Sequence, residues 1–254
     1  MQIVILGTGN VATVLGQQFV TAGHEVVQVY GRNEQNARLL AERLQSTSTS
    51  TLSALTAAAD LYVLAVSDTA ISAVAKELQT GKKLIVHTAG SVSKEVLRHC
   101  SANYGIVYPL QSLRKEMTVI PTIPLLVDGN TEDALTVIYD FAATVSPMVQ
   151  KSTDEERLKL HVAAVVVSNF TNHLYAMAEK YCREEKVDFG LLLPLIISIA
   201  DRLQYFSAAE VQTGPAIRND TSTINKHLAI LASHPQLADL YSWFTKSIQE
   251  ESSK

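Results

Sequence analysis

Short β-branched runs alternate with amphipathic stretches from residue 1 to about residue 150. This alternation is typical of a parallel sheet whose strands are joined by crossover helices. After the first run, Val11, Leu15 and Phe19 recur every four residues, and Gly23 ends the predicted helix. The Ser/Thr-rich segment Ser46–Ser53 predicts an exposed crossover or an edge strand. The predicted strands span residues 2–6, 25–30, 61–66, 83–88 and 104–108, with weaker candidates at 123–128 and 146–150.

The pattern changes after about residue 152. No turn signal occurs between Thr153 and Glu185, and the acids Asp154–Glu156 stand at the expected helix start, where negative charge is favoured. Further helices are predicted over residues 188–206, 220–233 and 236–250. We therefore predict a doubly wound, mainly parallel α/β Rossmann domain over residues 1–152 and an all-α domain over residues 153–254.

The composition is that of an ordinary globular protein, with 47% hydrophobic and 18% charged residues. The chain has 21 Lys and Arg against 25 Asp and Glu and no basic block, so nucleic acid is not an expected partner. Cys100 and Cys182 lack metal-ligand spacing, and no metal is expected. The most apolar stretch, Phe189–Ile199, is too short for a membrane span. Because the first strand begins at residue 2, no signal peptide is expected and a cytoplasmic location follows.

The first strand runs directly into a glycine turn of the form G-x-G-x-x-A, and a predicted helix follows at once. In this context Gly7 permits a tight turn, Gly9 lets a pyrophosphate approach the backbone, and Ala12 allows close packing of helix on strand. The free amides at the helix start, around Asn10 and Val11, then face the phosphates. The turn predicts a dinucleotide site.

The residues after the second strand indicate which dinucleotide is bound. A site for NAD, FAD or S-adenosylmethionine usually has Asp or Glu there, to accept hydrogen bonds from ribose hydroxyls. This chain has Arg32 and Asn33 instead, about twenty residues beyond the glycine turn. The forked guanidinium of Arg32 suits a 2′-phosphate, although a merely solvated charge is the alternative. NADP is favoured over NAD.

Two further strand ends belong to the same predicted site. In open α/β sheets, ligands lie beyond the carboxyl ends of the strands near the topological switch point. For Asp68, capping of the following helix is a competing role. The residues expected to line the cleft beside the nicotinamide half are Val66, Ser67, Asp68, Thr88, Ala89 and Gly90.

With these motifs the chain resembles the superfamily of 6-phosphogluconate and β-hydroxyacid dehydrogenases, pyrroline-5-carboxylate reductases and deazaflavin-dependent NADP oxidoreductases. The segments GTGNVA, YGRN, AVSD and HTAGS carry this resemblance over about 150 residues. The chain is most similar to a bacterial family of NADP oxidoreductases, in which a Rossmann-like domain precedes a helical domain of unassigned function. The segments typical of that family are YPLQSL at 108–113, HVAAVVVSN at 161–169 and TGPAIRNDTSTINKHL at 213–228.

Two positions depart from the resembling proteins. Tyr108 stands where an H-P-L-Q pattern more often has His, so an imidazole is absent at that position. Related hydroxyacid dehydrogenases place a catalytic Lys four residues before an Asn on the first long helix, and Val165 occupies that position before Asn169. The lysine-based dehydrogenase mechanism is therefore not implied for this chain.

Polar residues lie along the first long predicted helix. The 3.6-residue period places Asn169 and Asn172 within roughly 80° and 20° of His161 around the axis. A histidine ordinarily titrates near neutral pH, so His161 is a candidate general acid for a carbonyl or imine substrate. Asn169 is a candidate to orient the substrate or the nicotinamide carboxamide. The alternative is a set of interhelical hydrogen bonds in a dimer core.

A second polar cluster follows Gly214. Asp220, Thr223 and His227 stand at i, i+3 and i+7, on one predicted helix face. Arg218 is a candidate to hold a substrate carboxylate bidentately. The alternative is a structural turn in which Asp220 caps the helix and pairs with Arg218. Asp220 is kept as a third catalytic candidate, and His227 and Gln111 are further predicted substrate contacts.

These observations predict an NADP(H)-dependent oxidoreductase. It would transfer hydride between NADP and a small carbonyl, imine or hydroxyacid-type substrate in a cleft between the domains. A deazaflavin as hydride partner is a narrower variant, and a non-catalytic NADP-binding sensor or scaffold is the alternative. A homodimer through the C-terminal helices is expected, with no nucleic-acid or membrane partner.

Overall fold

The structure is a computed structural model that describes residues 1–252 of the chain. The chain divides into two compact units, Met1–Ser168 and the part from Asn169 onward. The predicted domain boundary, between residues 152 and 153, falls inside the first unit, where a long helical segment begins. We describe each unit separately.

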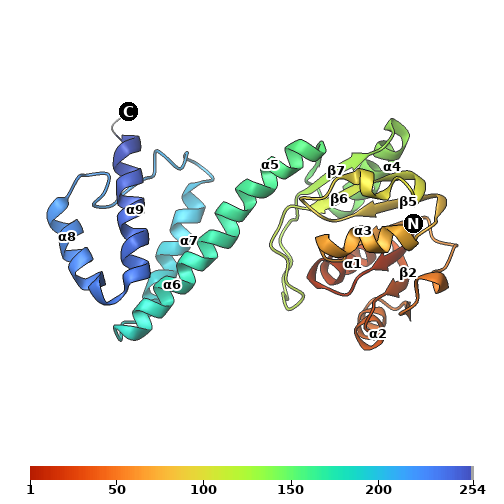
Figure 1. Cartoon of the computed structure of the whole chain (residues 1–254), viewed down its shortest axis with the longest axis horizontal. Helices are drawn as coiled ribbons and strands as arrows, with labels where there is room; N and C mark the ends of the chain where they lie inside the picture. The colour runs from red at the N-terminus through yellow and green to blue at the C-terminus, as the bar shows by residue number, and fades with distance from the viewer. Residues whose placement is uncertain (253–254) are drawn as a thin grey trace. The chain divides into compact units, whose positions relative to one another are not determined.

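The first unit contains an eight-stranded sheet in the order β3-β2-β1-β4-β5-β6-β7-β8. Figure 1 shows this sheet with the helices that pack on it. Every neighbouring pair is parallel except β6 with β7, so the predicted doubly wound sheet is confirmed. The segment Ser46–Ser53 contains β3, an edge strand as predicted. The strands are β1 (Gln2–Leu6), β2 (Glu25–Tyr30), β3 (Thr47–Thr49), β4 (Leu61–Leu64), β5 (Gly81–His87), β6 (Ser101–Pro109), β7 (Leu125–Gly129) and β8 (Val149–Lys151).

Helices cover both faces of this sheet. One apolar core joins the sheet to α1, α2 and α4, and a second core joins the opposite face to α3 and the short η2. Strand β1 lies between them, and its residues 3–6 are completely buried. An uninterrupted apolar strand is what burial on both faces requires. The helices of this layer are α1 (Asn10–Thr21), α2 (Glu34–Arg43), η1 (Leu52–Ala54), α3 (Asp68–Glu77), η2 (Lys94–Leu97) and α4 (Glu132–Val145).

The topological switch point lies between β1 and β4, since β2 and β3 extend the sheet on one side of β1 and the later strands on the other. The turn after β1 passes very close to β4 there. Gly7 has a φ of +134°, its amide donates to the Tyr30 carbonyl at 2.8 Å, and a methyl group on it would overlap the Ala65 carbonyl. Only glycine combines this backbone conformation with this close approach.

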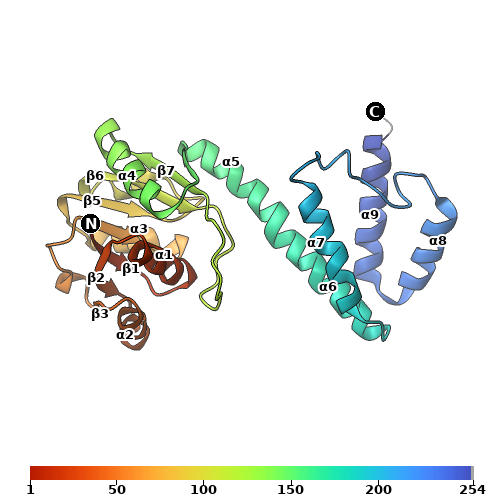
Figure 2. The ribbon, with the colours of Figure 1, turned by 180° about the vertical axis from the view of Figure 1, so that it is seen from behind.

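The remainder of the described chain is helical, as predicted (Figure 2). A capping box between Thr153 and Glu156 starts α5, which the acids of its first turn also favour. None of the helices in residues 1–252 has the length and apolarity needed to cross a membrane. The elements are α5 (Asp154–Ala164), η3 (Val165–Phe170), α6 (Thr171–Glu184), η4 (Phe189–Leu192), α7 (Leu193–Arg202), α8 (Thr221–Ile230), η5 (Leu231–Ser233) and α9 (Pro235–Ser252).

The long helical segment is not one regular α-helix. Between α5 and α6 the segment η3 is π-helical, with hydrogen bonds one residue longer than those of an α-helix. The predicted angles of Asn169 and Asn172 relative to His161 assumed an α-helical period throughout, and they are wrong for this reason. Asn169 lies in η3 with its side chain exposed.

The turn at Gly7 provides a test of the fold. We expect Gly7→Ala to lower the free energy of unfolding by at least about 2 kcal/mol, because the new methyl group overlaps the β4 backbone at a strained φ. Gly9→Ala is the matched control, since a methyl there meets nothing within 4 Å. Urea unfolding measures both, and equal stability of the Gly7 variant and the wild type would contradict the close approach.

Candidate functional site

A groove of about 670 Å³ lies beyond the carboxyl ends of β1, β2 and β4. It is therefore at the switch point, where ligands of open α/β sheets bind. Its volume is within the usual range for a small-molecule site. Of the predicted cofactor residues, the groove is lined by Gly7, Gly9, Arg32, Asn33, Val66 and Ser67.

The start of α1 is suited to a pyrophosphate. Gly9 is its N-cap, no side chain caps the helix, and its first turn carries no acid. The first helical hydrogen bond runs from Thr13 to the Gly9 carbonyl, so the amides of Asn10, Val11 and Ala12 have no partner within the helix. The space above Gly9 is open. A buried Ala12 packs into the core behind the turn, as predicted.

The groove is also lined by the guanidinium of Arg32, just after β2. Arg32 is exposed, and none of the ion pairs among residues 1–252 involves it. Asn33 caps α2 by accepting the Asn36 amide at 2.9 Å. A methyl group on Gly31 would meet the Thr8 side chain, which would then have to shift. A guanidinium outside every described ion pair fits a phosphate ester, so these residues fit NADP.

Tyr108 and His161 form a hydrogen-bonded pair at the end of β6. The Tyr108 hydroxyl lies 2.9 Å from His161 Nδ1, and the two rings are nearly perpendicular with centroids 5.9 Å apart. His161 reaches this position from α5. Both rings pack over the loop after β5, since a methyl on Gly90 would overlap both of them. The predicted nicotinamide loop and the predicted general acid therefore meet in the first unit.

Burial and nearby charges change the pKa of the Tyr108 hydroxyl. Burial raises the pKa of the Tyr108 hydroxyl, the Asp68 carboxylate raises it further, and the Arg157 guanidinium opposes both. Asp68 is the first residue of α3, whose N-cap is Ser67, and it accepts a hydrogen bond from the Ser91 hydroxyl at 2.7 Å. The capping role considered for Asp68 is therefore wrong.

A buried histidine holds the loop after β5 in shape. Burial lowers the pKa of His87 to about 4, so the ring is neutral at physiological pH. The Ala89 amide donates to Nδ1 at 3.2 Å, and Nε2 lies 3.3 Å from the Ser93 carbonyl. Because a carbonyl can only accept, the proton is on Nε2. Thr88 donates to the Leu64 carbonyl at 3.3 Å and ties the same loop to β4.

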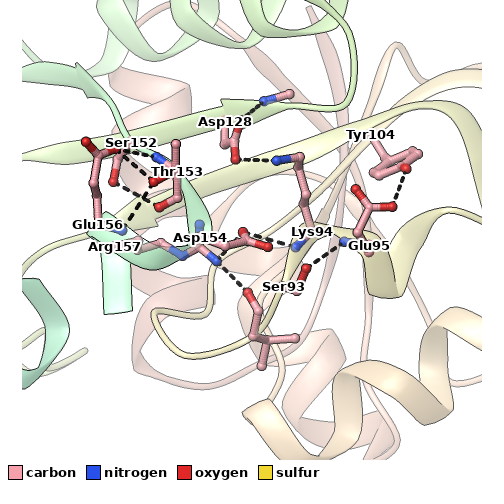
Figure 3. Close-up of polar contacts among 12 residues, drawn as sticks. Ser93, Lys94, Glu95, Tyr104, Asp128, Ser152, Thr153, Asp154, Glu156 and Arg157 are labelled. Atoms are coloured by element: carbon pink, nitrogen blue, oxygen red, sulfur yellow. Dashed lines mark hydrogen bonds and ion pairs between the residues drawn. The ribbon is translucent and has the colours of Figure 1, made fainter. Parts of the chain in front are cut away.

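Polar contacts also fix the start of α5 against η2 and β7 (Figure 3). Lys94 Nζ pairs with Asp128 at 2.6 Å, with both side chains largely buried. The Lys94 amide donates to Asp154 at 3.4 Å, and Arg157 pairs with the same carboxylate at 2.8 Å. The position of His161 is thus set from the beginning of its helix.

The remaining predicted site residues are described within their own units. Asp220 caps α8, accepting the Thr223 amide at 3.0 Å and the Thr223 hydroxyl at 2.7 Å, as the structural alternative predicted. Among the described residues no ion pair joins it to Arg218, which is exposed. His227 Nδ1 lies 2.8 Å from the Tyr241 hydroxyl. In the first unit, exposed Gln111 accepts the Ser112 amide at 2.9 Å.

Sequence reasoning missed Tyr108, His87 and Arg157 as members of the site. From the sequence, Tyr108 was interpreted only as replacing a histidine of the resembling proteins. In the structure, His161 of α5 brings an imidazole to the same place. The signal that could have found Tyr108 is its position at the end of a predicted strand beside the nicotinamide loop.

Known protein families match both parts of this chain. Residues 2–90 match a family described as NADP oxidoreductase, coenzyme F420-dependent, and residues 123–248 match a domain of unknown function, DUF2520. The chain is 34% identical to protein BF3122 of Bacteroides fragilis, assigned to the NADP oxidoreductases, with a TM-score of 0.90 over 98% of each chain. The chain belongs to the NADP oxidoreductase family. The predicted family, fold class and NADP cofactor are thereby confirmed.

Two further solved structures share the fold of this chain. A 1-pyrroline-5-carboxylate reductase from Streptococcus pyogenes is 14% identical, with a TM-score of 0.67 over 98% of each chain. A reductive aminase from Aspergillus terreus, in complex with NADPH and ethyl levulinate, is 18% identical, with a TM-score of 0.73 over 98% of this chain and 92% of the aminase. The sequence has no significant match among curated proteins.

Cofactor selectivity tests the predicted role of Arg32. We expect Arg32→Ala to weaken NADPH binding by about tenfold to a hundredfold, since a charge-assisted hydrogen bond contributes about 1.5–3 kcal/mol. Binding of NADH, which lacks the 2′-phosphate, should not change. Gly9→Ala should weaken both cofactors, because its methyl group occupies the space of the pyrophosphate. Calorimetry measures these affinities, with Arg38→Ala on the exposed face of α2 as the control. An equal loss for NADPH and NADH in Arg32→Ala would contradict the phosphate role.

The buried His87 predicts a pH dependence of stability. Its pKa is about 4 in the folded protein against an ordinary value of 6.5. Above pH 6.5 the ring is neutral in both states, and between pH 6.5 and 4 only the unfolded chain takes up the proton. The free energy of unfolding should therefore fall over that window, by up to about 3 kcal/mol.

His87→Gln isolates this effect, because the amide can accept from Ala89 and donate to Ser93 without titrating. Urea unfolding of both proteins at several pH values should show the wild type losing stability relative to His87→Gln as the pH falls from 6.5 to 4. Parallel curves would show that His87 does not titrate in this way.

Proposed function

We propose that this NADP oxidoreductase reduces a small carbonyl or imine compound, with the Tyr108–His161 pair as the proton donor. The observation that carries the proposal is the 2.9 Å contact between the Tyr108 hydroxyl and His161 Nδ1, packed on the Gly90 loop. Reduction of a C=O or C=N bond needs a hydride at carbon and a proton at the heteroatom. The pair supplies the proton where the parallel strands end.

The residues of the first unit have separate tasks in this mechanism. NADPH, when bound, supplies the hydride. The α1 amides and Arg32 would hold its pyrophosphate and 2′-phosphate, and the loop at Gly90 would support the nicotinamide end. Tyr108 donates its hydroxyl proton to the substrate oxygen or nitrogen as that atom gains the electron pair. A protonated His161 then returns a proton from Nδ1 to the tyrosine oxygen.

The substrate class is supported by chemistry and by the fold. Two enzymes with this fold are a 1-pyrroline-5-carboxylate reductase, which acts on a cyclic imine, and a reductive aminase. The imine part of the proposal is drawn from these two enzymes. Arg218 remains the proposed holder of a substrate carboxylate, since its guanidinium is exposed and outside every described ion pair. A deazaflavin as hydride partner is the narrower variant suggested by the family description.

A second candidate function is NADP binding without turnover, as a sensor or scaffold. Val165 favours it, because it occupies the position at which related hydroxyacid dehydrogenases have a catalytic lysine. NADPH binding without oxidation across a panel of carbonyl and imine substrates would support this function.

Turnover tests the proton donor. We expect Tyr108→Phe and His161→Ala to lower kcat by about 10²–10⁴-fold, the usual contribution of general acid catalysis, without changing the Kd for NADPH. Steady-state NADPH oxidation with the substrate panel measures the effect, and His99→Ala, an exposed histidine after η2, is the control. Full activity in both variants would contradict the proposed donor.

We also propose that the chain forms a homodimer through its C-terminal helices. Helix α7 is apolar around most of its circumference, yet Leu193, Leu195, Ile197 and Ile199 are each at least 50% exposed. A helix of this kind is normally buried. The buried apolar residues from Asn169 to Ser252 number only four (Cys182, Ala216, Ile224 and Leu231).

The oligomeric state tests this proposal. Light scattering at micromolar concentration should give twice the mass of the chain for the wild type. Leu195→Glu, which places a charge on the exposed face of α7, should give a monomer. A monomeric wild type would contradict the proposed dimer.

A further inference from the structure

Arg157 is the most deeply buried charged residue among those described. Its side chain is 1% exposed, although Arg is almost never fully buried unless it is paired. The Nη2 atom makes two hydrogen bonds, to the Val92 carbonyl at 2.6 Å and to Asp154 at 2.8 Å (Figure 3). Arg157 therefore joins the first turn of α5 to the loop between β5 and η2.

The bonding of this guanidinium is incomplete. Nε and Nη1 are buried and donate to no atom of the described residues. Its carboxylate partner is itself 34% exposed, so the positive charge is only partly compensated in the interior. A well-packed apolar side chain often replaces a buried ion pair with no loss of stability. Stability alone does not explain a cation at this position.

Arg157 is placed to act on the Tyr108–His161 pair. It precedes His161 by four residues on α5, so both side chains project from the same face of the helix. Its hydrogen-bond partner Val92 lies two residues beyond Gly90, the residue on which the pair packs. Arg157 thus connects the helix and the loop that hold the pair between them.

The charges that face Tyr108 come from two helices. Asp68, at the start of α3, raises the pKa of the hydroxyl, and Arg157, in α5, lowers it. His161, also in α5, contacts the hydroxyl directly. The guanidinium also lowers the pKa of His87, where it adds to the effect of burial. Arg157 is the cation that counters Asp68 at the tyrosine.

We propose that Arg157 is a positioning residue for the Tyr108–His161 pair: its guanidinium fastens the Val92 carbonyl to Asp154 and keeps a buried positive charge on the helix face that carries His161. The inference rests on the proposed function of the pair as a proton donor. Removing the charge would make the Tyr108 hydroxyl a weaker acid, and removing the Nη2 donor would loosen the loop under the two rings.

Titration of the tyrosine tests this without any need for turnover. Tyr108 is replaced by 3,5-difluorotyrosine, whose hydroxyl titrates in an accessible pH range, and its ¹⁹F NMR shift is followed against pH in the cofactor-free protein. In an Arg157→Met background we expect the midpoint to rise by about one pH unit. Lys159→Met is the matched control, since Lys159 is on the same helix, is 71% exposed and should not move the midpoint.

Asp154→Asn is a second variant that does not depend on the folding of Arg157→Met. It removes the carboxylate but keeps the guanidinium, so the midpoint should fall. Unchanged midpoints in both variants, or a shift as large in Lys159→Met, would overturn the proposal. A shift in the expected directions without NADPH oxidation by any substrate would retain the positioning role and reject the proposed reductase function.

If the protein oxidises NADPH with a substrate, steady-state kinetics of Arg157 variants distinguish a positioning role from a general loss of folded protein. We expect Arg157→Met to lower kcat at neutral pH more than it changes KM, and to move the pH profile of kcat in the direction of the tyrosine midpoint. Arg157→Lys keeps the charge but does not place a nitrogen where Nη2 contacts Val92 and Asp154. It should therefore restore the pH profile more fully than it restores kcat. A uniform loss with an unchanged profile would contradict the electrostatic part of the proposal.

Discussion

The turn between β1 and α1 passes very close to the end of β4, and the cofactor groove at the carboxyl ends of the strands depends on this close approach. Gly7 sits against the Ala65 carbonyl at a φ of +134°, so the chain turns sharply at the centre of the sheet. The start of α1 then lies directly beyond the strands with its first amides free. Because β4, β5 and β6 run parallel to β1, their ends bring Ser67, Gly90 and Tyr108 to the same edge.

Much of this edge could be predicted from the sequence because its causes are local. Burial on both faces makes β1 continuously apolar, and the sharp turn requires glycine at position 7. The missing acid after β2 could likewise be seen directly, since the position of Arg32 is set by its distance along the chain from the turn. The alternation of strands and helices then determined the fold class.

The proposed catalytic pair could not be predicted in the same way, because it depends on contacts distant in sequence. Tyr108 and His161 are 53 residues apart and meet only when α5 packs on the end of β6. Arg157 looks like one more charge on an amphipathic helix until its burial is known. The π-helical turn at η3 has no local sequence signal comparable to a glycine or a proline, so the angles of Asn169 and Asn172 were wrong.

If the proposal is right, the nicotinamide end of NADP meets the Tyr108–His161 pair over Gly90. A crystal structure of the protein with NADP⁺ bound would show whether it does. We expect the 2′-phosphate at Arg32, the pyrophosphate over Gly9, and the nicotinamide ring against Gly90 with the Tyr108 hydroxyl beside its C4 face. A nicotinamide ring that points away from the β5 and β6 strand ends, with Tyr108 out of reach, would contradict the claim.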